Sequence, residues 1–309
     1  MNEVYPVVAK LGEVGFDVKS VCEVLEVSRS GYYAFRKDTP SARKREDERL
    51  KPIIKDTFFS HKRRYGKRRM AEELQALGES CGRDKTARIM QEMELFAIQP
   101  RSFKPRTTNS RHKLGYNENL LRDLAHPKTI NRVWVGDITY IPLMKSWAYL
   151  AMLMDLCSRR IVGWSLEDHM RESLVLAALH DAIAWRQPPA DLIHHTDRGG
   201  QYAGTEYRNV LARAEMKQSM SGAGDCYDNA FMESCFGTIK TELELTAYES
   251  IEQARQEITE YINYYDTRRR HSGIDYLSCP ESARKGFQVM LALFSLAGNR
   301  KNHAVKGSA

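Results

Sequence analysis

The chain has 309 residues, of which 42% are hydrophobic and 28% are charged. That length accommodates two or three domains, and that composition excludes a wholly disordered protein. No apolar run approaches the roughly 18–20 residues that a membrane span needs, and the first residues do not open a charged-then-apolar signal peptide. The six cysteines include no CxxC pair, which disfavours a zinc ribbon or a disulfide framework. We therefore expect a cytoplasmic chain with reduced thiols and no membrane partner.

Positive charge is concentrated in the first third of the chain. The formal net charge is +7, yet residues 1–115 carry 25 Lys and Arg against 16 Asp and Glu, a net charge of +9. The remaining residues carry 22 against 24, a net charge of −2, and the two parts sum to the +7 of the whole. A basic region on a near-neutral body indicates an anionic partner, most often nucleic acid. A solvated, solubilising surface is the alternative interpretation.

Residues 1–45 are predicted to be helical. Val18–Leu25 is a short amphipathic segment, Glu26 and Val27 interrupt it, and Ser28 can cap the helix that follows. Two short helices joined by a tight turn have the dimensions of a helix-turn-helix, although an ordinary helical hairpin would have the same pattern.

Residues 46–98 form a second predicted helical region with a strongly basic segment. A charged helix covers 41–51 and a further helix runs to Phe59, after which six of the nine residues from 61 to 69 are Lys or Arg. Two apolar helical segments follow on either side of Gly78. A basic segment directly before a helix-turn-helix is best explained by contacts with DNA phosphates. We therefore predict that five cations contact DNA: Arg63, Arg64, Lys67, Arg68 and Arg69.

A basic linker is predicted at 99–127, where the chain contains prolines and, up to residue 113, no acid. After the linker, the sequence pattern changes from helical to mixed helix and strand. Residues 128–285 are predicted to form the main domain, followed by a C-terminal tail at 286–309. Three consecutive strands precede helices that alternate with short strands, which is the pattern of an α/β fold with a mixed sheet. The predicted strands are 133–141, 148–154, 161–166, 192–195 and 216–220, and the predicted helices are 172–185, 206–214 (capped by Thr205), 229–245 and 251–265.

Three carboxylates lie where this layout would gather them. Asp137 lies inside an apolar strand, where an Asp is costly unless it is paired or bound to a metal. Asp197 follows a short strand directly, at the kind of strand end where open α/β sheets bind ligands. Glu233 lies on a predicted helix. Each acid also has an ordinary interpretation: Asp137 as a cap or as the partner of Arg159, Asp197 as a turn residue, and Glu233 as an exposed helix residue.

Lys240 and Asn229 are predicted to share one stripe of that helix with Glu233. At about 100° per residue, the seven steps from Glu233 to Lys240 end about 20° short of two full turns. A separate apolar arc is expected to pack against the sheet and to leave the stripe at its edge. That arc consists of Phe231, Cys235, Ile239 and Leu243. Lys240 would then contact a phosphate or a base.

Three acids brought together repel one another, and divalent cations relieve that repulsion. Oxygen ligands without a Cys or His cluster favour Mg²⁺ or Mn²⁺ over zinc. Two such ions can activate a water or a 3′-hydroxyl and stabilise the leaving oxygen of a phosphoryl transfer. We therefore predict that Asp137, Asp197 and Glu233 are both metal ligands and catalytic residues, with two Mg²⁺ ions, or Mn²⁺ in their place. His194 is interpreted as structural, and His195 as near the site at best.

These motifs resemble the insertion sequence three family of transposases, specifically its OrfB product. Thirty-five residues separate Asp197 from Glu233, and Lys240 lies seven positions after Glu233. This spacing is similar to the Asp-Asp-Glu core of retroviral-integrase-like transposases. The segments WVGDIT (134–139), HTDRGGQY (195–202), YDNAFME (227–233) and YDTRRRH (265–271) narrow the resemblance, and YGKRRM (65–70) is similar to the helix-turn-helix segment of that family.

The resemblance implies an RNase H-like core that binds Mg²⁺, and an all-α helix-turn-helix region in front of it. It implies 3′-end cleavage of DNA at terminal inverted repeats and strand transfer to target DNA, without a covalent protein–DNA intermediate. It also implies a bacterial, nucleoid-associated protein that acts as a homo-oligomer in the synaptic complex, with an upstream OrfA-type partner or as a frameshift fusion. Arg269 and His271 are expected to contact DNA phosphates.

Three residues depart from the pattern of that family. Thr196, Cys235 and Asp266 stand where Ser, Phe and Asn are expected, and none of them is one of the three acids. The departures therefore do not predict an inactive site. Two rival interpretations remain at this stage: an RNase H-like nuclease that cuts without joining strands, and a DNA-binding regulator whose core no longer catalyses.

Overall fold

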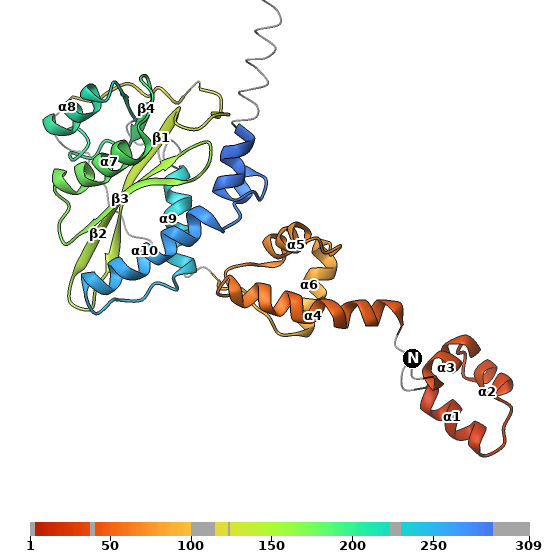
Figure 1. Ribbon diagram of the computed structural model, residues 1–309. Coiled ribbons are helices and arrows are strands. Elements are labelled where there is room, and N and C mark those ends of the chain that lie inside the picture. Colours follow the sequence, from red (N-terminus) through yellow and green to blue (C-terminus); the bar gives the residue numbers. More distant parts are fainter. Residues whose placement is uncertain (1–3, 38–40, 100–114, 123, 223–229, 287–309) are drawn as a thin grey trace, which may run out of the picture. The chain divides into compact units, whose positions relative to one another are not determined.

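The computed structural model describes residues 4–37, 41–99, 115–122, 124–222 and 230–286. The chain divides into two compact units, Met1–Phe96 and Ala97–Ala309 (Figure 1). Within the described part of the chain, none of the helices is long and apolar enough to cross a membrane.

The first three helices form a small bundle. They are α1 (Tyr5–Glu13), α2 (Val18–Val24) and α3 (Arg29–Arg36). Their buried core consists of Val8, Val21, Cys22 and Tyr32. Ser28 Oγ caps α3 by accepting a hydrogen bond from the Gly31 N–H (3.0 Å), and the Asp17 carboxylate caps α2 in the same way. The predicted helix at 18–25 and the predicted Ser28 cap are thereby confirmed.

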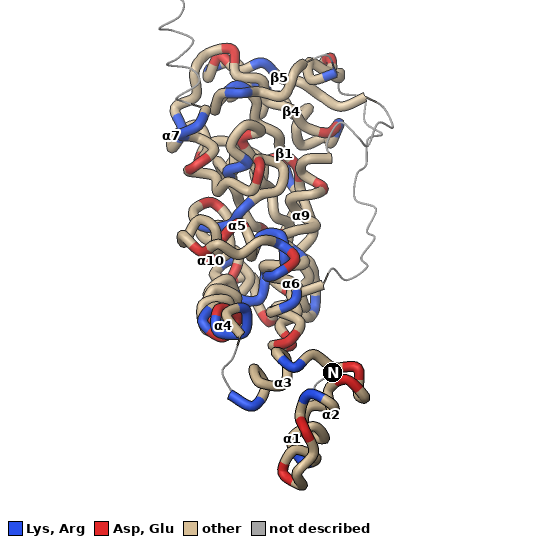
Figure 2. Tube along the Cα trace, turned by 90° about the vertical axis from the view of Figure 1, so that its right-hand side faces the viewer, with Lys and Arg blue, Asp and Glu red and all other residues tan. Residues whose placement is uncertain are grey.

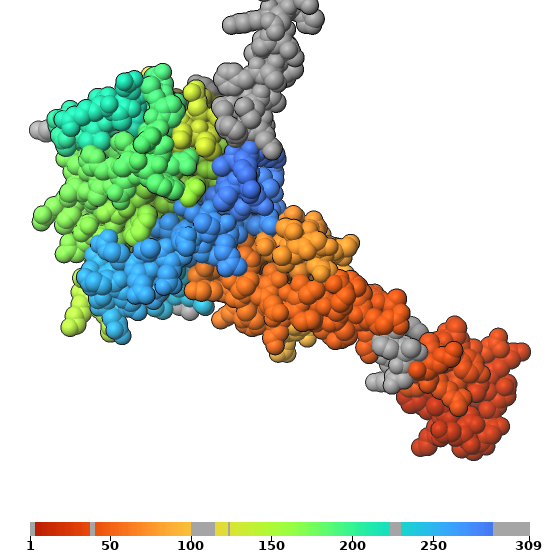
Figure 3. Space-filling view, viewed as in Figure 1, coloured from red at the N-terminus to blue at the C-terminus, as the bar shows by residue number. Residues whose placement is uncertain are grey.

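Helices α4 (Ala42–Ser60), α5 (Lys67–Ala76) and α6 (Arg83–Glu92) form a second bundle. Lysines, arginines and acids alternate around α4 (Figure 2), and the side chains of the three helices pack into one body, orange in Figure 3. Ser41 caps α4, which then continues without a break through the charged and the apolar segments. The predicted boundary between residues 45 and 46 is therefore wrong, because it lies inside this helix.

The second unit is built on a five-stranded mixed sheet with the strand order β3-β2-β1-β4-β5. β1 (Val133–Pro142), β2 (Trp147–Asp155) and β3 (Ile161–Glu167) form an antiparallel meander. β4 (Ile193–Thr196) and β5 (Lys217–Met220) run parallel to β1. The three long strands are apolar on both faces because helices cover both sides of the sheet. Each predicted strand is confirmed to within one residue at either end.

Two pairs of helices cover the two faces of this sheet. α7 (Glu172–Arg186) and α8 (Thr205–Arg213) share a core with Trp134 of β1. α9 (Ala230–Glu242) and α10 (Ile251–Thr267) share a core with the neighbouring Val133 and Val135, whose side chains point to the opposite face. A short 3-10 helix, Ser272–Ile274, follows α10. This arrangement is the predicted α/β architecture, an RNase H-like mixed sheet with flanking helices.

Of two local predictions in this unit, one is wrong and one is confirmed. Thr205 does not cap α8, because it is the first helical residue, and the Glu172 carboxylate accepts the hydrogen bond of the Tyr207 N–H (2.9 Å) instead. The predicted apolar arc of α9 does pack on the core: Cys235 and Ile239 are buried there, and the partly buried Phe231 and Leu243 pack against it. The Arg159 guanidinium also lies 4.5 Å from the centre of the Phe231 ring. The residues that α9 buries are Met232, Cys235, Phe236, Ile239 and Glu242.

Candidate active site

Asp137 lies in the middle of β1 and faces the α9 side of the sheet. Side chains alternate along a strand, and Val135 and Ile141, which have the same phase, belong to the core beneath α9 and α10. The side chain of Asp137 is half-buried, and its Oδ1 atom accepts a hydrogen bond from the Ile138 N–H (2.8 Å). The central strand therefore fixes this carboxylate at the sheet surface.

Asp197 follows β4 directly and lies level with Asp137. β4 runs parallel to β1, and Val135 pairs with His195, two positions before Asp197. Asp197 Oδ1 accepts a hydrogen bond from the Gly199 N–H (2.9 Å), which orients the carboxylate as the chain turns away from the sheet. A Cβ at position 199 would lie 3.0 Å from the same oxygen, so the turn favours glycine there.

Glu233 and Lys240 are contributed by α9, which packs on the sheet through Met232 and Ile239. The Glu233 side chain is exposed, and that of Lys240 is half-buried. Asp137 interacts electrostatically with Asp197, Glu233 and Lys240. The structure therefore brings the three predicted acids and the predicted lysine together. Asn229, the remaining residue of the predicted stripe, lies outside the described residues.

The electrostatics of this group show an excess of negative charge. Burial raises the pKa of Asp137 well above its usual value, and repulsion from Asp197 and Glu233 adds to the rise. The Ile138 N–H and the Lys240 ammonium oppose it. Burial lowers the pKa of Lys240, and attraction to Asp137 counteracts that shift. A cation bound between the acids would relieve this repulsion.

The donor set of the site fits a divalent ion. The three acids offer carboxylate oxygens, the ligand type that Mg²⁺ and Mn²⁺ prefer. Two neighbouring histidines are buried in hydrogen bonds instead: His194 Nε2 lies 2.7 Å from the Tyr207 hydroxyl, and His195 Nδ1 lies 2.8 Å from Ser219 Oγ. Burial lowers the pKa of His194 to about 3, so this ring stays neutral, which agrees with its predicted structural role.

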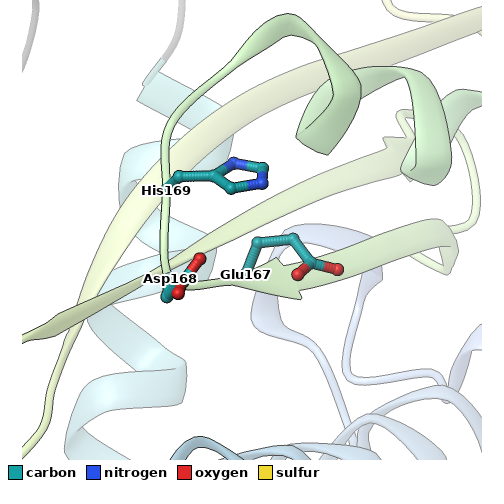
Figure 4. Close-up of side chains that lie close together, drawn as sticks. All are labelled: Glu167, Asp168 and His169. Atoms are coloured by element: carbon teal, nitrogen blue, oxygen red, sulfur yellow. The ribbon is translucent and has the colours of Figure 1, made fainter.

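Sequence reasoning missed a second acidic group, Glu167, Asp168 and His169, at the end of β3. One ligand atom from each residue lies within 4.8 Å of the others, and Figure 4 shows the three side chains near one another. Three consecutive residues form this cluster, and its only sequence signal is the tripeptide itself. Exposed acidic groups are common without an ion, and Glu167 also lies 3.9 Å from Arg255. We assign no function to this cluster.

Two of the predicted DNA contacts are corrected by their burial. Arg269 is 3% exposed, and its guanidinium donates hydrogen bonds to the Glu242 carboxylate (2.6 Å for the shortest). His271 is 5% exposed, and its Nε2 atom lies 3.3 Å from the Tyr265 carbonyl oxygen. Both side chains stabilise the interior of the second unit, so the prediction that they contact DNA is wrong.

The basic segment before α5 divides in the same way. Arg64 is only 9% exposed, so its side chain belongs to the interior of the first unit and the predicted DNA contact is corrected. Arg63, Lys67 and Arg68 are exposed, and Arg69 is half-buried. Arg63, Lys67 and Arg68 therefore lie on the surface of the second bundle, and Arg69 lies partly within it.

The ordinary interpretation of Asp137 as the partner of Arg159 is not what the structure shows. Arg159 lies 3.2 Å from His126 Nε2, with its guanidinium 4.5 Å from the centre of the Phe231 ring. Within the described part of the chain, Asp137 therefore forms no ion pair with Arg159. The positive charge that acts on Asp137 is the Lys240 ammonium, which lowers the pKa of the carboxyl.

The comparisons with protein families agree with this layout. Two protein-family models, both described as an integrase core domain, match residues 127–226 and 214–278, which together contain all three acids. The description "HTH-like domain" matches residues 44–103, which contain α4, α5 and α6.

Several curated proteins are similar to the chain over most of their length. The IS600 31 kDa protein of Shigella sonnei is 41% identical over 88% of this chain and 100% of its own. Transposase InsF for insertion sequence IS3A of Escherichia coli is 37% identical over 85% of this chain and 92% of its own length. The IS904 transposase of Lactococcus lactis is 39% identical over 77% of this chain and 95% of its own length. By its integrase core, its HTH-like domain and these relatives, the chain belongs to the IS3 family of insertion-sequence transposases.

Proposed function

We propose that Asp137, Asp197 and Glu233 hold divalent metal ions and that this site cleaves and joins DNA strands. The observation that carries the proposal is the convergence of three carboxylates, from β1, from the end of β4 and from α9, beside Lys240. Such a site suits phosphoryl transfer, because positive charge must offset the negative charge of the reacting phosphate. Mg²⁺ is the proposed ion, two per site, and Mn²⁺ is its proposed substitute.

Each residue has a distinct part in this proposal. Two bound ions would supply Lewis acidity to the attacking and the leaving oxygen of the phosphodiester. Asp137 is the ligand fixed by the central strand, and Asp197 is oriented by the Gly199 N–H. Glu233 approaches from the surface of α9, and the Lys240 ammonium, on the same helix, contacts a phosphate of the bound DNA.

The proposed substrate is DNA at the terminal inverted repeats of the element. Water first cuts at the 3′ ends, and the freed 3′-hydroxyl then attacks a phosphodiester of the target. Each step forms one phosphorus–oxygen bond and breaks one, so the chemistry needs neither a covalent enzyme intermediate nor an external source of energy. The similarity to the InsF and IS904 transposases supports this sequence of steps.

The HTH-like domain is proposed to bind the DNA that the core cuts. Its exposed cations Arg63, Lys67 and Arg68 lie just before and in the first turn of α5, where phosphate contacts are favoured by the helix dipole as well as by charge. We also propose that the protein acts as a homo-oligomer in the synaptic complex. An upstream OrfA-type partner, separate or fused by a frameshift, would complete the recognition of the ends.

A cleavage and strand-transfer assay on labelled DNA that carries the ends of the element tests this proposal. Wild type, Glu233→Gln and Glu206→Gln would be compared with Mg²⁺, with Mn²⁺ and with EDTA. Glu206 is an exposed glutamate of α8, on the other face of the sheet, and serves as the matched control. We expect metal-dependent joined products from wild type and from Glu206→Gln, and none from Glu233→Gln.

Other outcomes of this assay separate the rival functions. Metal-dependent cuts without joined products would favour a nuclease. Equal activity of Glu233→Gln and wild type would remove Glu233 from the site. If wild type alone is inactive, the assay is repeated with the upstream product added or fused, and continued inactivity would favour a DNA-binding regulator.

A further inference from the structure

α2 and α3 have the geometry of a helix-turn-helix that lies outside the matched HTH-like domain. Four residues, from Leu25 to Ser28, join the two helices, and Glu26 takes a φ of 52°, which tightens the turn. α1 packs against both helices and completes a three-helix bundle around Tyr32. In proteins with this motif, the second helix is the one that lies in the major groove of DNA.

α3 buries one face in this bundle and leaves the other in solvent. Tyr32 is 2% exposed, and Phe35, although 43% exposed, stacks on Tyr5 with 5.6 Å between the ring centres. Gly31 lies so close to the Tyr5 hydroxyl that an added Cβ would clash with it. The exposed side chains with polar groups fall within an arc of roughly 120° on a helical wheel, facing away from the core, and the exposed Ala34 lies beside that arc. The side chains in the arc are Arg36, Arg29, Tyr33 and Ser30.

Charge is segregated within the bundle. Residues 29–37 contain three cations and no acid, whereas residues 4–28 contain four acids and two lysines. Figure 2 shows the same division, with blue but no red along α3. Arg29 and Arg36 form no ion pair with any described residue. The exposed face of the second helix is therefore the basic face of a bundle that is otherwise acidic.

In the HTH-like domain, α6 is the second helix of the helix-turn-helix, and its cations, unlike those of α3, form ion pairs. On α6, Arg88 lies 2.8 Å from Asp47, and Lys85 lies 3.8 Å from Glu46, so these cations are partly neutralised by α4. The arginines of α3, which pair with no acid among the described residues, are therefore expected to attract an anion more strongly.

We propose that α3 is a second DNA-binding helix of this chain, which places Arg29, Tyr33 and Arg36 in a major groove at a site separate from that of the HTH-like domain. The two guanidinium groups fit phosphates or guanine edges, and the Ser30 and Tyr33 hydroxyls can bond to phosphates or to base edges. A face with cations, hydroxyls and no acid fits duplex DNA better than it fits a protein.

Salt-dependent binding of the full chain to a labelled 30-base-pair duplex in EDTA tests the proposal. Arg29→Ala/Arg36→Ala is compared with Lys10→Ala/Lys19→Ala, which removes the same charge from exposed positions on α1 and α2. Each lost phosphate contact lowers the slope of log K against log salt by about 0.9. We expect the arginine variant to lose a slope of roughly 1.8, and the lysine variant to keep the wild-type slope. Arg29→Lys/Arg36→Lys should retain most of the slope, which distinguishes lost contacts from misfolding.

A photo-crosslinking experiment supplies a second measurement. A benzophenone side chain in place of Tyr33 should crosslink to the labelled DNA, and the same group in place of Phe16, which is 59% exposed in the loop before α2, should not. Equal slopes for the two alanine variants would overturn the proposal. So would crosslinking at position 33 to a second protein chain without DNA, which would make this face a protein-docking surface. Because EDTA is present throughout, a failure here is independent of the metal site.

Discussion

Breaking the ion pair between Glu242 and Arg269 should strongly destabilise the second unit. The two side chains are 6% and 3% exposed, and Arg269 Nη2 lies 2.6 Å from Glu242 Oε1. Arg269 Nε donates a further hydrogen bond to the carboxylate (2.9 Å), as does the Tyr261 hydroxyl (3.0 Å). The pair ties the end of α9, the helix that carries Glu233, to the segment that follows α10.

The expected magnitude follows from this burial. Glu242→Gln leaves the arginine buried without a counter-charge, and breaking a buried pair from one side typically costs about 3–5 kcal/mol. In a domain of roughly 150–250 residues, each 1 kcal/mol lowers Tm by about 2–4 °C. The variant should therefore unfold on the order of 6–20 °C below wild type.

Thermal unfolding followed by circular dichroism measures this difference, and an exposed pair is the matched control. Lys217 lies 2.8 Å from Asp191, but the two side chains are 57% and 69% exposed, so Lys217→Met should leave Tm unchanged. A loss in Glu242→Gln no larger than that in Lys217→Met would refute the reasoning from burial. The double variant Glu242→Leu/Arg269→Met should recover much of the loss, because it leaves no charge in the interior.

Two further predictions concern the stability of the same unit. Burial raises the pKa of Asp266 to about 7, against the opposing Ile161 N–H and nearby arginines, so the folded chain holds a proton that the unfolded chain releases near pH 4. The free energy of unfolding should therefore fall as the pH rises from about 4 to about 7. Asp266→Asn should be roughly 2–4 kcal/mol more stable than wild type at pH 8 and of similar stability at pH 4. Urea unfolding at both pH values measures this difference, and a gain that does not depend on pH would contradict the reasoning. Gly163→Ala should destabilise by about 1–3 kcal/mol or more, because its Cβ would press on the Ala178 carbonyl and on the backbone of α7. Gly237→Ala, on the open side of α9, should instead be neutral or stabilising by up to about 1 kcal/mol, and equal melting temperatures for the two variants would disprove this packing argument.

The strands and the positions of two of the acids could be predicted because their signals are local. Each long strand is an apolar run, and a single Asp137 within such a run stands out as a polar residue that needs a function. Asp197 is marked by the end of a short strand and by the glycines that follow it. The Ser28 cap and the helix around Glu233 also depend on neighbours a few residues away, which helical periodicity captures.

The errors came from contacts between distant parts of the chain. Arg269 belongs to a run of three arginines that looks exposed in the sequence, and its partner Glu242 lies 27 residues away. Arg64 lies in a basic run of the same appearance, and only the packing of the first unit separates it from the exposed Arg63 and Lys67. Charge in a sequence therefore indicates a basic region, but tertiary packing decides which of its members reach the surface.

Binding of Mn²⁺ to the full chain, measured by electron paramagnetic resonance titration, tests the central claim most directly. Wild type would be compared with Asp137→Asn and with Asp168→Asn, which removes a carboxylate from the second acidic group at the end of β3. The proposed site predicts that Asp137→Asn weakens Mn²⁺ binding by at least about tenfold, because a fixed carboxylate ligand is lost. Asp168→Asn should bind as wild type does. Wild-type binding by Asp137→Asn, or a loss of binding confined to Asp168→Asn, would contradict the assignment of the metal site to Asp137, Asp197 and Glu233.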